Sequence, residues 1–433
     1  MSGTSLFLFT FNCGKNRQPV EAIQHAVQKA LKPETSSAAA PPQVLIFGFE
    51  EVTSILDASF GLLSDHLAPI TLGISAGIKS IYPSTEALYV QAARSQLGAI
   101  ATIVYVLDSS TIPGAIPLET ISSSTAGTRR GYGYSSLKGA AGVRISLKPK
   151  GDSSSTPQEF TFVNAHLAAN EGHLLTRNAD FDGIVTSLGF SDGYGAYKPQ
   201  SHLFFMGDLN YRATRAAEPT ERALLEASET AGHDEDGAPL DSDRYYDVLK
   251  RTDELFHVLQ THQSFYGFEE APVNFPPTFK YIEGTIGTFN QKRTPSWCDR
   301  ILYLPYKSPA QIVSYASLPS VLTSDHKPVY LRINVPPTPP QPVFEPEPGA
   351  PKRLLLLPEY SPAATRAVPQ TGAPAVAPIR VSLGLGDHAG YYNGVGWTAD
   401  MAIGWSLYLV NTPRGRIYAG LFLVALFALY LIL

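Results

Sequence analysis

The sequence predicts a layered α/β domain with largely antiparallel sheets. Apolar, strand-like runs and amphipathic helical stretches follow one another in mixed order, and hairpin-like polar segments join several of the strands. A doubly wound parallel sheet would instead alternate strands and helices regularly. The chain of 433 residues exceeds one ordinary domain, and its composition changes after residue 335.

The individual elements of this domain are predicted from apolar periodicity. Strands are expected at 5–11, 44–49, 100–106, 141–147, 159–165, 201–206, 300–303 and 328–334. Pro19 opens an amphipathic helix whose apolar face carries Val20, Ile23 and Val27. Further helices are expected at 170–188, 219–230 and 244–262. Residues 107–136, rich in Ser, Thr and Gly, predict a long loop.

The segment after residue 335 has a different composition. Of the 35 prolines in the chain, 13 fall within residues 336–378. We therefore expect residues 336–380 to form an extended, disordered linker after a folded domain at 1–335. The juxtamembrane residues 381–416 are rich in glycine and aromatic side chains and receive no assignment.

The last 17 residues, 417–433, contain no charge and no proline. As a helix they would span roughly 26 Å at about 1.5 Å per residue, enough for a thin bilayer such as the endoplasmic reticulum. Tyr418 and Tyr430 lie near the two ends, and Arg414 and Arg416 favour a cytosolic position for the preceding side. The pattern predicts a C-terminal transmembrane helix with the folded domain in the cytosol.

Composition argues against several classes of function. A formal net charge of −5 is too small for a nucleic-acid-binding surface, which needs a basic stripe. Two cysteines, Cys13 and Cys298, are too few for a disulfide framework or a zinc cage and favour a reducing compartment. The apolar run at 6–11 lacks the basic flank and length of a secretory signal.

Polar side chains follow the predicted strand at 201–206. Gly207 interrupts it, and Asp208 and Asn210 come next. In extended geometry, side chains two residues apart point the same way, so a carboxylate and a carboxamide would emerge together. Such a carboxylate can deprotonate a water, and the amide can donate to an oxyanion. Taken alone, the pair also suits a capping aspartate and a turn asparagine.

Other polar residues lie where further predicted strands begin or end. They are Asn12, Glu51, His166, Asp299, Asp325 and His326. Each one singly suits a structural role, but together they provide what cleavage of a phosphate ester needs. Hard oxygen ligands such as Glu51 and Asn12 suit Mg²⁺. Histidines can neutralise a phosphate, a carboxylate can orient each imidazole, and Asp208 can activate water.

Two motifs, Phe205–Arg212 and Pro295–Leu302, resemble those of the inositol-polyphosphate 5-phosphatases, within the endonuclease/exonuclease/phosphatase superfamily. Shorter segments match in the same order: Thr10–Asn12, Gly48–Glu51, Asn164–Ala169, Pro277–Tyr281 and Ser324–Val329. The resemblance covers about 5–335. It implies a four-layer α/β sandwich of two packed, mainly antiparallel sheets.

The resemblance also implies roles for the candidate catalytic residues. Asp208 would position and deprotonate the attacking water, and Asn210 would steady the phosphoryl oxygens. His166 and His326 would contact the scissile phosphate. Asp299 would orient His326 and hold its imidazole in one tautomer.

Metal and substrate ligands follow from the same resemblance. Glu51 would bind Mg²⁺ directly, supported by Asn12 and Asp325. The implied substrate-binding residues are Lys280, Lys292, Arg293 and Arg300, the first three of them at the 4-phosphate of a phosphoinositide. Two departures, Phe279 in place of a tyrosine and Leu137 in place of an asparagine, bear on substrate affinity.

These observations predict a monomeric, tail-anchored, fungal-type phosphatidylinositol 4,5-bisphosphate 5-phosphatase on the cytosolic face of the endoplasmic reticulum. One alternative is a nuclease or sphingomyelinase of the same superfamily, which Lys280 and the motif at 295–302 disfavour. Another is a catalytically inactive, membrane-tethered phosphoinositide-binding protein. That protein would be expected to have lost Asp208, His326 or Glu51, and all three are present.

Overall fold

The computed structural model describes residues 3–32, 40–83, 88–111, 114–215, 218–221, 250–361, 380–382 and 389–432. The first of two six-stranded sheets has the order β11-β12-β1-β2-β4-β3. Its strands are β1 (Thr4–Asn12), β2 (Val44–Glu50), β3 (Tyr89–Leu97), β4 (Ile100–Leu107), β11 (Gln311–Ser317) and β12 (Val329–Val335).

The second sheet has the order β5-β6-β7-β8-β10-β9. Its strands are β5 (Leu118–Arg129), β6 (Gly139–Pro149), β7 (Gln158–His166), β8 (Ser201–Asp208), β9 (Glu269–Glu270) and β10 (Asp299–Tyr303). Among the described strands only the β1–β2 and β7–β8 pairs are parallel. The prediction of two packed, mainly antiparallel sheets is confirmed.

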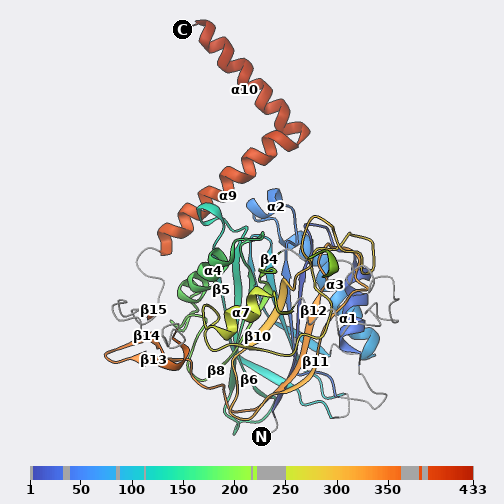
Figure 1. Cartoon of the computed structure of the whole chain (residues 1–433), viewed down its shortest axis with the longest axis vertical. Helices are drawn as coiled ribbons and strands as arrows, with labels where there is room; N and C mark the ends of the chain where they lie inside the picture. The colour runs from blue at the N-terminus through green and yellow to red at the C-terminus, as the bar shows by residue number, and fades with distance from the viewer. Residues whose placement is uncertain are drawn as a thin grey trace.

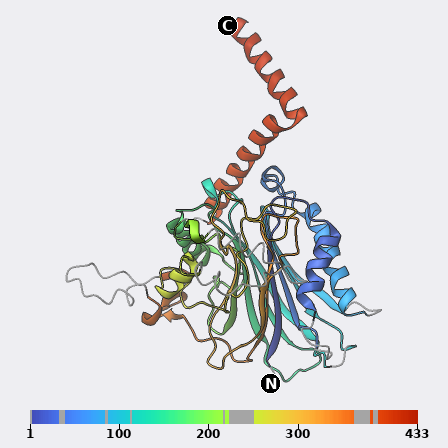
Figure 2. The same ribbon diagram turned by 45° about the vertical axis from the view of Figure 1, so that its right-hand side comes forward.

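Helices cover the outer face of each sheet, so the molecule has four layers (Figures 1 and 2). Those on the first sheet are α1 (Val20–Leu31) and α3 (Ser64–Ile81), and those on the second are α4 (Leu174–Ser187) and α7 (Glu254–Gln260). In β1, Leu6 and Leu8 enter the core between the sheets, whereas Phe7 and Phe9 pack beneath α1 and α3. Since successive side chains of a strand point to opposite faces, the 6–9 stretch of β1 is apolar on both faces rather than alternating.

Residues 107–136, predicted as a loop, instead contain β5, so this prediction was wrong. The strand pairs with β6 along its length, from Leu118 opposite Pro149 to Arg129 opposite Gly139. Because it lies at the sheet edge, most of its serine and threonine side chains are exposed. An exposed edge strand therefore has the composition of a loop. Of the helices expected at 219–230 and 244–262, residues 222–249 lie outside the described part.

The prediction of a disordered linker from residue 336 was also wrong over the described residues up to 361. Strands β13 (Phe344–Glu347), β14 (Ala350–Leu356) and β15 (Arg380–Ser382) form a small antiparallel sheet. Val343, Phe344, Leu354 and Leu356 are buried in the core beside the second large sheet. The apolar residues between the prolines thus supply enough buried surface to order the segment. Residues 362–379 lie outside the described part.

The chain continues into α9 (Ala389–Asn411), which lies against the sandwich, and α10 (Pro413–Ile432), which projects away from it (Figure 1). Within the described residues, no helix combines the length and the apolar character needed to span a bilayer. The side chains of 428–433, the end of the predicted anchor, lie outside the described residues. The transmembrane helix at 417–433 stays a prediction.

Candidate active site

The candidate residues converge because their strands end at the same edge of the two sheets. In the first sheet, Asn12 at the end of β1 pairs in register with Glu50 at the end of β2. In the second, Asp208 at the end of β8 lies opposite both His166 of β7 and Asp299 of β10. Strand register aligns these residues within each sheet, and the packing of the two sheets brings Asn12 against Asp208.

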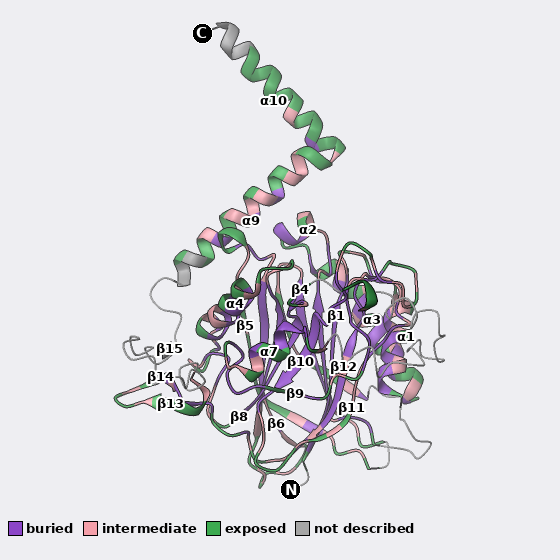
Figure 3. Cartoon of the chain, viewed as in Figure 1, coloured by how far each residue is buried: buried purple, intermediate pink, exposed green. Residues whose placement is uncertain are grey.

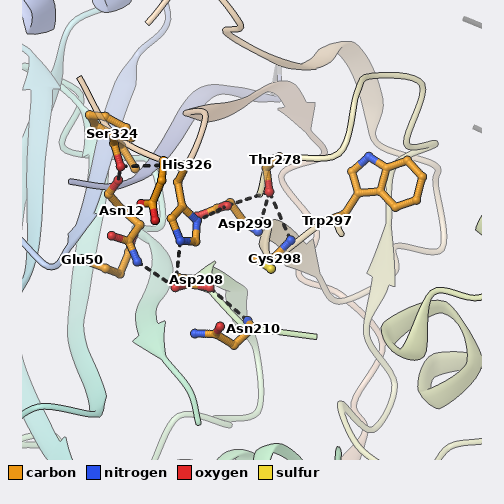
Figure 4. Close-up of polar contacts among 12 residues, drawn as sticks. Asn12, Glu50, Asp208, Asn210, Thr278, Trp297, Cys298, Asp299, Ser324 and His326 are labelled. Atoms are coloured by element: carbon orange, nitrogen blue, oxygen red, sulfur yellow. Dashed lines mark hydrogen bonds and ion pairs between the residues drawn. The ribbon is translucent and has the colours of Figure 1, made fainter. Parts of the chain in front are cut away.

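Asp208 is the centre of the cluster (Figure 4). Its Oδ2 accepts a hydrogen bond from Asn12 Nδ2 at 2.8 Å, and lies 3.3 Å from His166 Nε2 and 4.0 Å from His326 Nε2. Burial opposes ionisation of this carboxyl, but His326 and His166 outweigh it and lower its pKa below the usual value. Asp208 is therefore a buried carboxylate at neutral pH.

The backbone around Asp208 requires Gly207. That residue has φ +132°, and a Cβ there would lie 2.0 Å from the carbonyl oxygen of Ala165. The strand ends at Asp208, and Asn210 has φ +57°. The expectation of extended geometry through Asn210 was therefore wrong: the Asn210 backbone N–H donates to Asp208 Oδ1 at 3.1 Å in a turn.

The Asn210 side chain is held beside the site by two neighbours. Its Nδ2 donates to the carbonyl oxygen of Leu167 at 3.2 Å, and its Oδ1 accepts from the Arg212 guanidinium. A primary amide carries two N–H donors, so one remains for a phosphoryl oxygen. Arg212 was not predicted. It lies 4.2 Å from the centre of the Phe279 ring.

On one side of Asp208, His326 is held as an imidazolium. Its Nδ1 donates to Asp299 Oδ2 at 2.9 Å, and the same oxygen accepts from Thr278 Oγ1 at 2.6 Å (Figure 4). Burial alone would lower the pKa of His326, but the carboxylates of Asp299 and Asp208 raise it to about 9. Asp299 thus contacts His326 as an orienting residue would, and its catalytic role stays a prediction.

On the other side, His166 has a cation as its neighbour. Lys138 Nζ donates to His166 Nε2, and Glu51 Oε1 lies 3.7 Å from the same nitrogen. Burial and Lys138 together lower the pKa of His166, so its imidazole is neutral at pH 7. Burial also lowers the pKa of Lys138 to about 8. Lys138 was not predicted as a site residue, although it directly precedes Gly139, the register partner of His166.

Glu50 is a second residue of the cluster that was not predicted. Its side chain is fully buried and accepts from Thr10 Oγ1 at 3.2 Å. Burial, together with the nearby Asp299 and Asp208, raises its pKa well above the usual value. Burial and the neighbouring carboxylates therefore favour the protonated form of Glu50 relative to an ordinary glutamate.

Glu51 is the residue best suited to hold a divalent cation. Although burial opposes it, His166 and Lys138 lower the pKa of this carboxyl, and Lys15 Nζ lies 3.0 Å from its Oε2. Asp208, Asp299 and His326 also lie close enough together to hold an ion, with their ligand atoms within 4.8 Å of one another. A protonated imidazole, however, cannot ligate a metal. The oxygen donors present suit a hard cation such as Mg²⁺.

The two residues predicted to support the metal have other partners. Asn12 Oδ1 accepts from the backbone N–H of Gly14 at 2.9 Å while its Nδ2 donates to Asp208, so Asn12 orients Asp208. Asp325 Oδ2 accepts from Lys280 Nζ at 2.8 Å. Asp325 is not part of the described group of Asp208, Asp299 and His326 whose ligand atoms could hold an ion. Their metal-supporting roles stay predictions.

The predicted phosphate-binding residues are Lys280, Lys292 and Arg293. They lie on one loop at 280–293, the basic loop, whose two ends are joined by backbone hydrogen bonds. Asn290 N donates to the carbonyl oxygen of Lys280 at 2.8 Å, and Arg293 N donates to that of Asn290 at 3.2 Å. Lys292 is exposed, and the Arg293 guanidinium lies 3.7 Å from Glu171. Because Lys280 also contacts Asp325, next to His326, the loop adjoins the cluster around Asp208.

Arg300 does not belong to this site, and its predicted substrate-binding role was wrong. The residue is buried, and its guanidinium donates to Asp253 Oδ2 and Glu270 Oε1, both at 2.7 Å. Asp299 and Arg300 are neighbours in β10, so their side chains point to opposite faces of the sheet. Asp299 therefore faces the site, whereas Arg300 holds β9 and the start of α7.

Comparison with known proteins agrees with this geometry. The family model described as endonuclease/exonuclease/phosphatase family 2 matches residues 9–332. Polyphosphatidylinositol phosphatase INP53 of Saccharomyces cerevisiae is 34% identical over 206 residues, 46% of this chain and 16% of its own length. Human phosphatidylinositol 3,4,5-trisphosphate 5-phosphatase 2 is 30% identical over 207 residues, 45% of this chain and 14% of its own. The chain thus spans about a sixth or less of the length of these two hydrolases.

Solved structures share the fold. The inositol polyphosphate 5-phosphatase domain of SPsynaptojanin, in complex with inositol (1,4)-bisphosphate and calcium, matches with a TM-score of 0.57 at 22% identity, over 77% of this chain and 84% of that one. A Cimex nitrophorin in its ferrous NO complex matches with a TM-score of 0.50 at 20% identity, over 77% of this chain and 100% of that one. A shared fold therefore does not determine the chemistry, which depends on the site residues. The family model covers most of the sandwich and the cluster around Asp208, and the chain belongs to the endonuclease/exonuclease/phosphatase family 2.

Proposed function

We propose that this protein is a Mg²⁺-dependent phosphoinositide 5-phosphatase that converts phosphatidylinositol 4,5-bisphosphate to phosphatidylinositol 4-phosphate. The observation that carries the proposal is the buried Asp208 carboxylate between the neutral imidazole of His166 and the imidazolium of His326. The Asp208 carboxylate can act as the base, and the His326 imidazolium beside it can stabilise a developing anion. The INP53 and trisphosphate 5-phosphatase relatives support the same class of substrate.

In the proposed reaction, Asp208 orients a water and accepts its proton as the water oxygen bonds to phosphorus. The bond between phosphorus and the 5-oxygen of inositol breaks, and its electron pair leaves on that oxygen, which is protonated from solvent. His326 and the remaining Asn210 N–H stabilise the phosphoryl oxygens. When bound at Glu51, Mg²⁺ supplies charge neutralisation at these oxygens.

The basic loop gives the proposed substrate its second contact. Lys280 and Arg293 are already paired with carboxylates, Asp325 and Glu171, and a phosphate would replace or bridge these partners. Ammonium and guanidinium groups suit phosphate, and each such contact contributes on the order of 1.5–3 kcal/mol. Phe279 provides no hydroxyl donor here, so we expect narrower discrimination for the 4-phosphate than a tyrosine would give.

We further propose that the enzyme is anchored in a membrane. Residues 417–433 would anchor a monomer in the endoplasmic reticulum, with the sandwich in the cytosol and no nucleic-acid partner. In α10, the side chains of Leu421, Phe422 and Val424 are more than 60% exposed. Exposure of these apolar side chains is unfavourable in water, which supports a lipid environment for this helix. Tethering would raise the effective concentration of the lipid substrate at the site.

A substrate panel with the full-length protein in lipid vesicles tests the proposal. With Mg²⁺ present, phosphate release should be fastest from phosphatidylinositol 4,5-bisphosphate and slower from phosphatidylinositol 5-phosphate. Lys280→Ala and Arg293→Ala should each reduce activity on the bisphosphate roughly ten- to hundredfold. Lys79→Ala, at an exposed lysine of α3, is the matched control and should have no effect.

Three other outcomes would contradict the proposal in different ways. Equal losses on both lipids would assign Lys280 and Arg293 to the scissile phosphate or to the fold. Cleavage of sphingomyelin or DNA in place of phosphoinositides would identify another enzyme of the superfamily. Binding to phosphoinositide vesicles without any turnover would identify a lipid-binding protein.

A further inference from the structure

Helix α9 lies at the end of the sandwich that carries the site (Figure 1). It contacts two elements there: α2 (Ile55–Ser59), which follows shortly after Glu51, and the short helix η1 (Tyr132–Tyr134), which precedes Lys138. The helix therefore bridges the segments that leave and enter the site on its Glu51 and Lys138 sides.

Asp400 is the only charged residue in the sequence of α9, and it is buried at 3% exposure. Its Oδ2 accepts from the Arg129 guanidinium, and its Oδ1 accepts from the backbone N–H of Ser136 at 2.9 Å. Arg129 precedes η1 and Ser136 follows it, so one carboxylate joins both limbs of the loop at 129–138. A buried carboxylate is unfavourable without such partners, which makes this docking position specific.

Small residues on either side of Asp400 allow the close contact. Gly396 lies one turn before it, and a Cβ there would be 2.3 Å from the carbonyl oxygen of Tyr134. Gly404 lies one turn after it, and a Cβ there would be 3.1 Å from the Phe60 ring. The buried face of α9 thus consists of residues spaced four apart, whereas much of its remaining surface is exposed (Figure 3).

The loop that Asp400 holds delivers Lys138 to His166. The backbone N–H groups of Arg130 and Gly131 donate to the carbonyl oxygen of Lys138, at 2.8 and 3.3 Å. The Lys138 ammonium then donates to His166 Nε2. A continuous set of contacts therefore runs from the carboxylate of Asp400 through the loop to the imidazole beside Asp208.

We propose that α9 is a positioning element of the active site, in which Asp400 holds the 129–138 loop so that Lys138 stays beside His166. The C-terminal part of the chain would then set the turnover rate of the sandwich as well as its location. The inference rests on the proposed function for its activity measurement only. The contact between α9 and the loop at 129–138 can be measured by hydrogen exchange, without turnover.

The test compares Asp400→Ala and Asp400→Asn in the full-length protein. Alanine removes both contacts, whereas asparagine retains an acceptor for the Ser136 N–H and loses the charge paired with Arg129. Hydrogen exchange at 129–138 should accelerate most for alanine and less for asparagine. The kcat on phosphatidylinositol 4,5-bisphosphate should fall roughly tenfold for alanine, with KM little changed, since the basic loop is untouched.

A matched pair of glycines provides a second route to the same contact. Gly396→Ala should accelerate exchange at 129–138 and lower kcat, whereas Gly394→Ala should change neither, because a Cβ at 394 meets no atom within 4 Å. In a Lys138→Met background, Asp400→Ala should cause no further loss of kcat, which a general structural defect would not reproduce.

The outcomes separate this inference from the proposed function. Faster exchange at 129–138 without a change in kcat would overturn the positioning role, as would an additive loss in the Lys138→Met background. Unchanged exchange in the Asp400 and Gly396 variants would overturn the docking itself. A wild-type protein that cleaves no phosphoinositide would overturn the proposed function, while the exchange experiment would still decide whether α9 holds the loop.

Discussion

The His166 and His326 sides of the site differ, although both imidazoles approach the same oxygen of Asp208, at 3.3 and 4.0 Å. Lys138 lies beside His166, and the pKa of that histidine is lowered. Asp299 lies beside His326, and the pKa of that histidine is raised to about 9. Burial and Lys138 keep His166 neutral, whereas the carboxylates of Asp299 and Asp208 outweigh burial and keep His326 cationic.

This difference shows that residue type alone does not assign a role. A histidine at the end of a strand is compatible with a base, a cation or a core residue, and its neighbours select among them. Together, His326 and His166 lower the pKa of Asp208, so that it is a carboxylate despite its burial. Substitution of Asp208 removes what the two sides share, whereas substitutions at Glu51, Lys138 and Asp299 alter one side each.

Asp208→Asn should have the largest effect, because it removes the carboxylate that both imidazoles face. We expect turnover to fall on the order of 10²–10⁴-fold, the contribution of a general base, with little change in melting temperature. Phosphate release and thermal melting of the purified variant measure the two effects. A variant that retains near-wild-type activity would show that Asp208 is not the base.

Glu51→Gln should weaken Mg²⁺ binding on the His166 side by removing the charge that a divalent ion would meet. The Mg²⁺ concentration giving half-maximal activity should rise at least about tenfold, and excess Mg²⁺ should restore part of the rate. Titration of activity with Mg²⁺ measures this. A rate that is equally low at every Mg²⁺ concentration would assign Glu51 a structural role instead.

Lys138→Met and Asp299→Asn should move opposite limbs of the pH–rate profile. Without the lysine, the pKa of His166 should rise, so that activity is lost earlier as the pH falls. Without the aspartate, the pKa of His326 should drop from about 9 towards its ordinary value, so that activity is lost earlier as the pH rises. Profiles that shift in the same direction would contradict the assignment of one neutral and one charged histidine.

The smallest effect concerns stability. Because the pKa of His326 is raised in the folded state to about 9, its stabilising contribution is full below the ordinary pKa of about 6.5 and is lost as the pH rises through 9. The melting temperature of wild type should exceed that of His326→Gln most at pH 6, and the difference should shrink by pH 9.5. A constant difference would mean that the histidine is neutral in both conditions.

The sequence predicted the site better than its surroundings. Asp208, His166 and Asp299 were selected because polar residues at strand ends are recognisable locally, and strand register then brought them together. Lys138 was missed because its position next to His166 depends on the pairing of β6 with β7. Arg300 was assigned to the site through a motif, although strand alternation directs it to the opposite face.

Edges and attached segments were predicted least well. The edge strand β5 has a loop-like composition because only one side of it is paired. After residue 335, the many prolines predicted a linker, although the apolar residues Phe344 and Leu354 pack beside the second sheet. In α9, the single charge at Asp400 gave no local indication that its partners are Arg129 and Ser136. Burial of such groups depends on contacts between distant segments.

The sequence by itself determined the α/β class, the apolar strands of both sheets and the carboxylates and imidazoles at their ends. Each of these follows from local periodicity and residue chemistry. Only the tertiary structure decided which histidine is charged, which of Asp299 and Arg300 faces the site, and where α9 docks. The physical reason is that protonation and pairing depend on the distance between groups and on their removal from water, and both are set only when the layers pack.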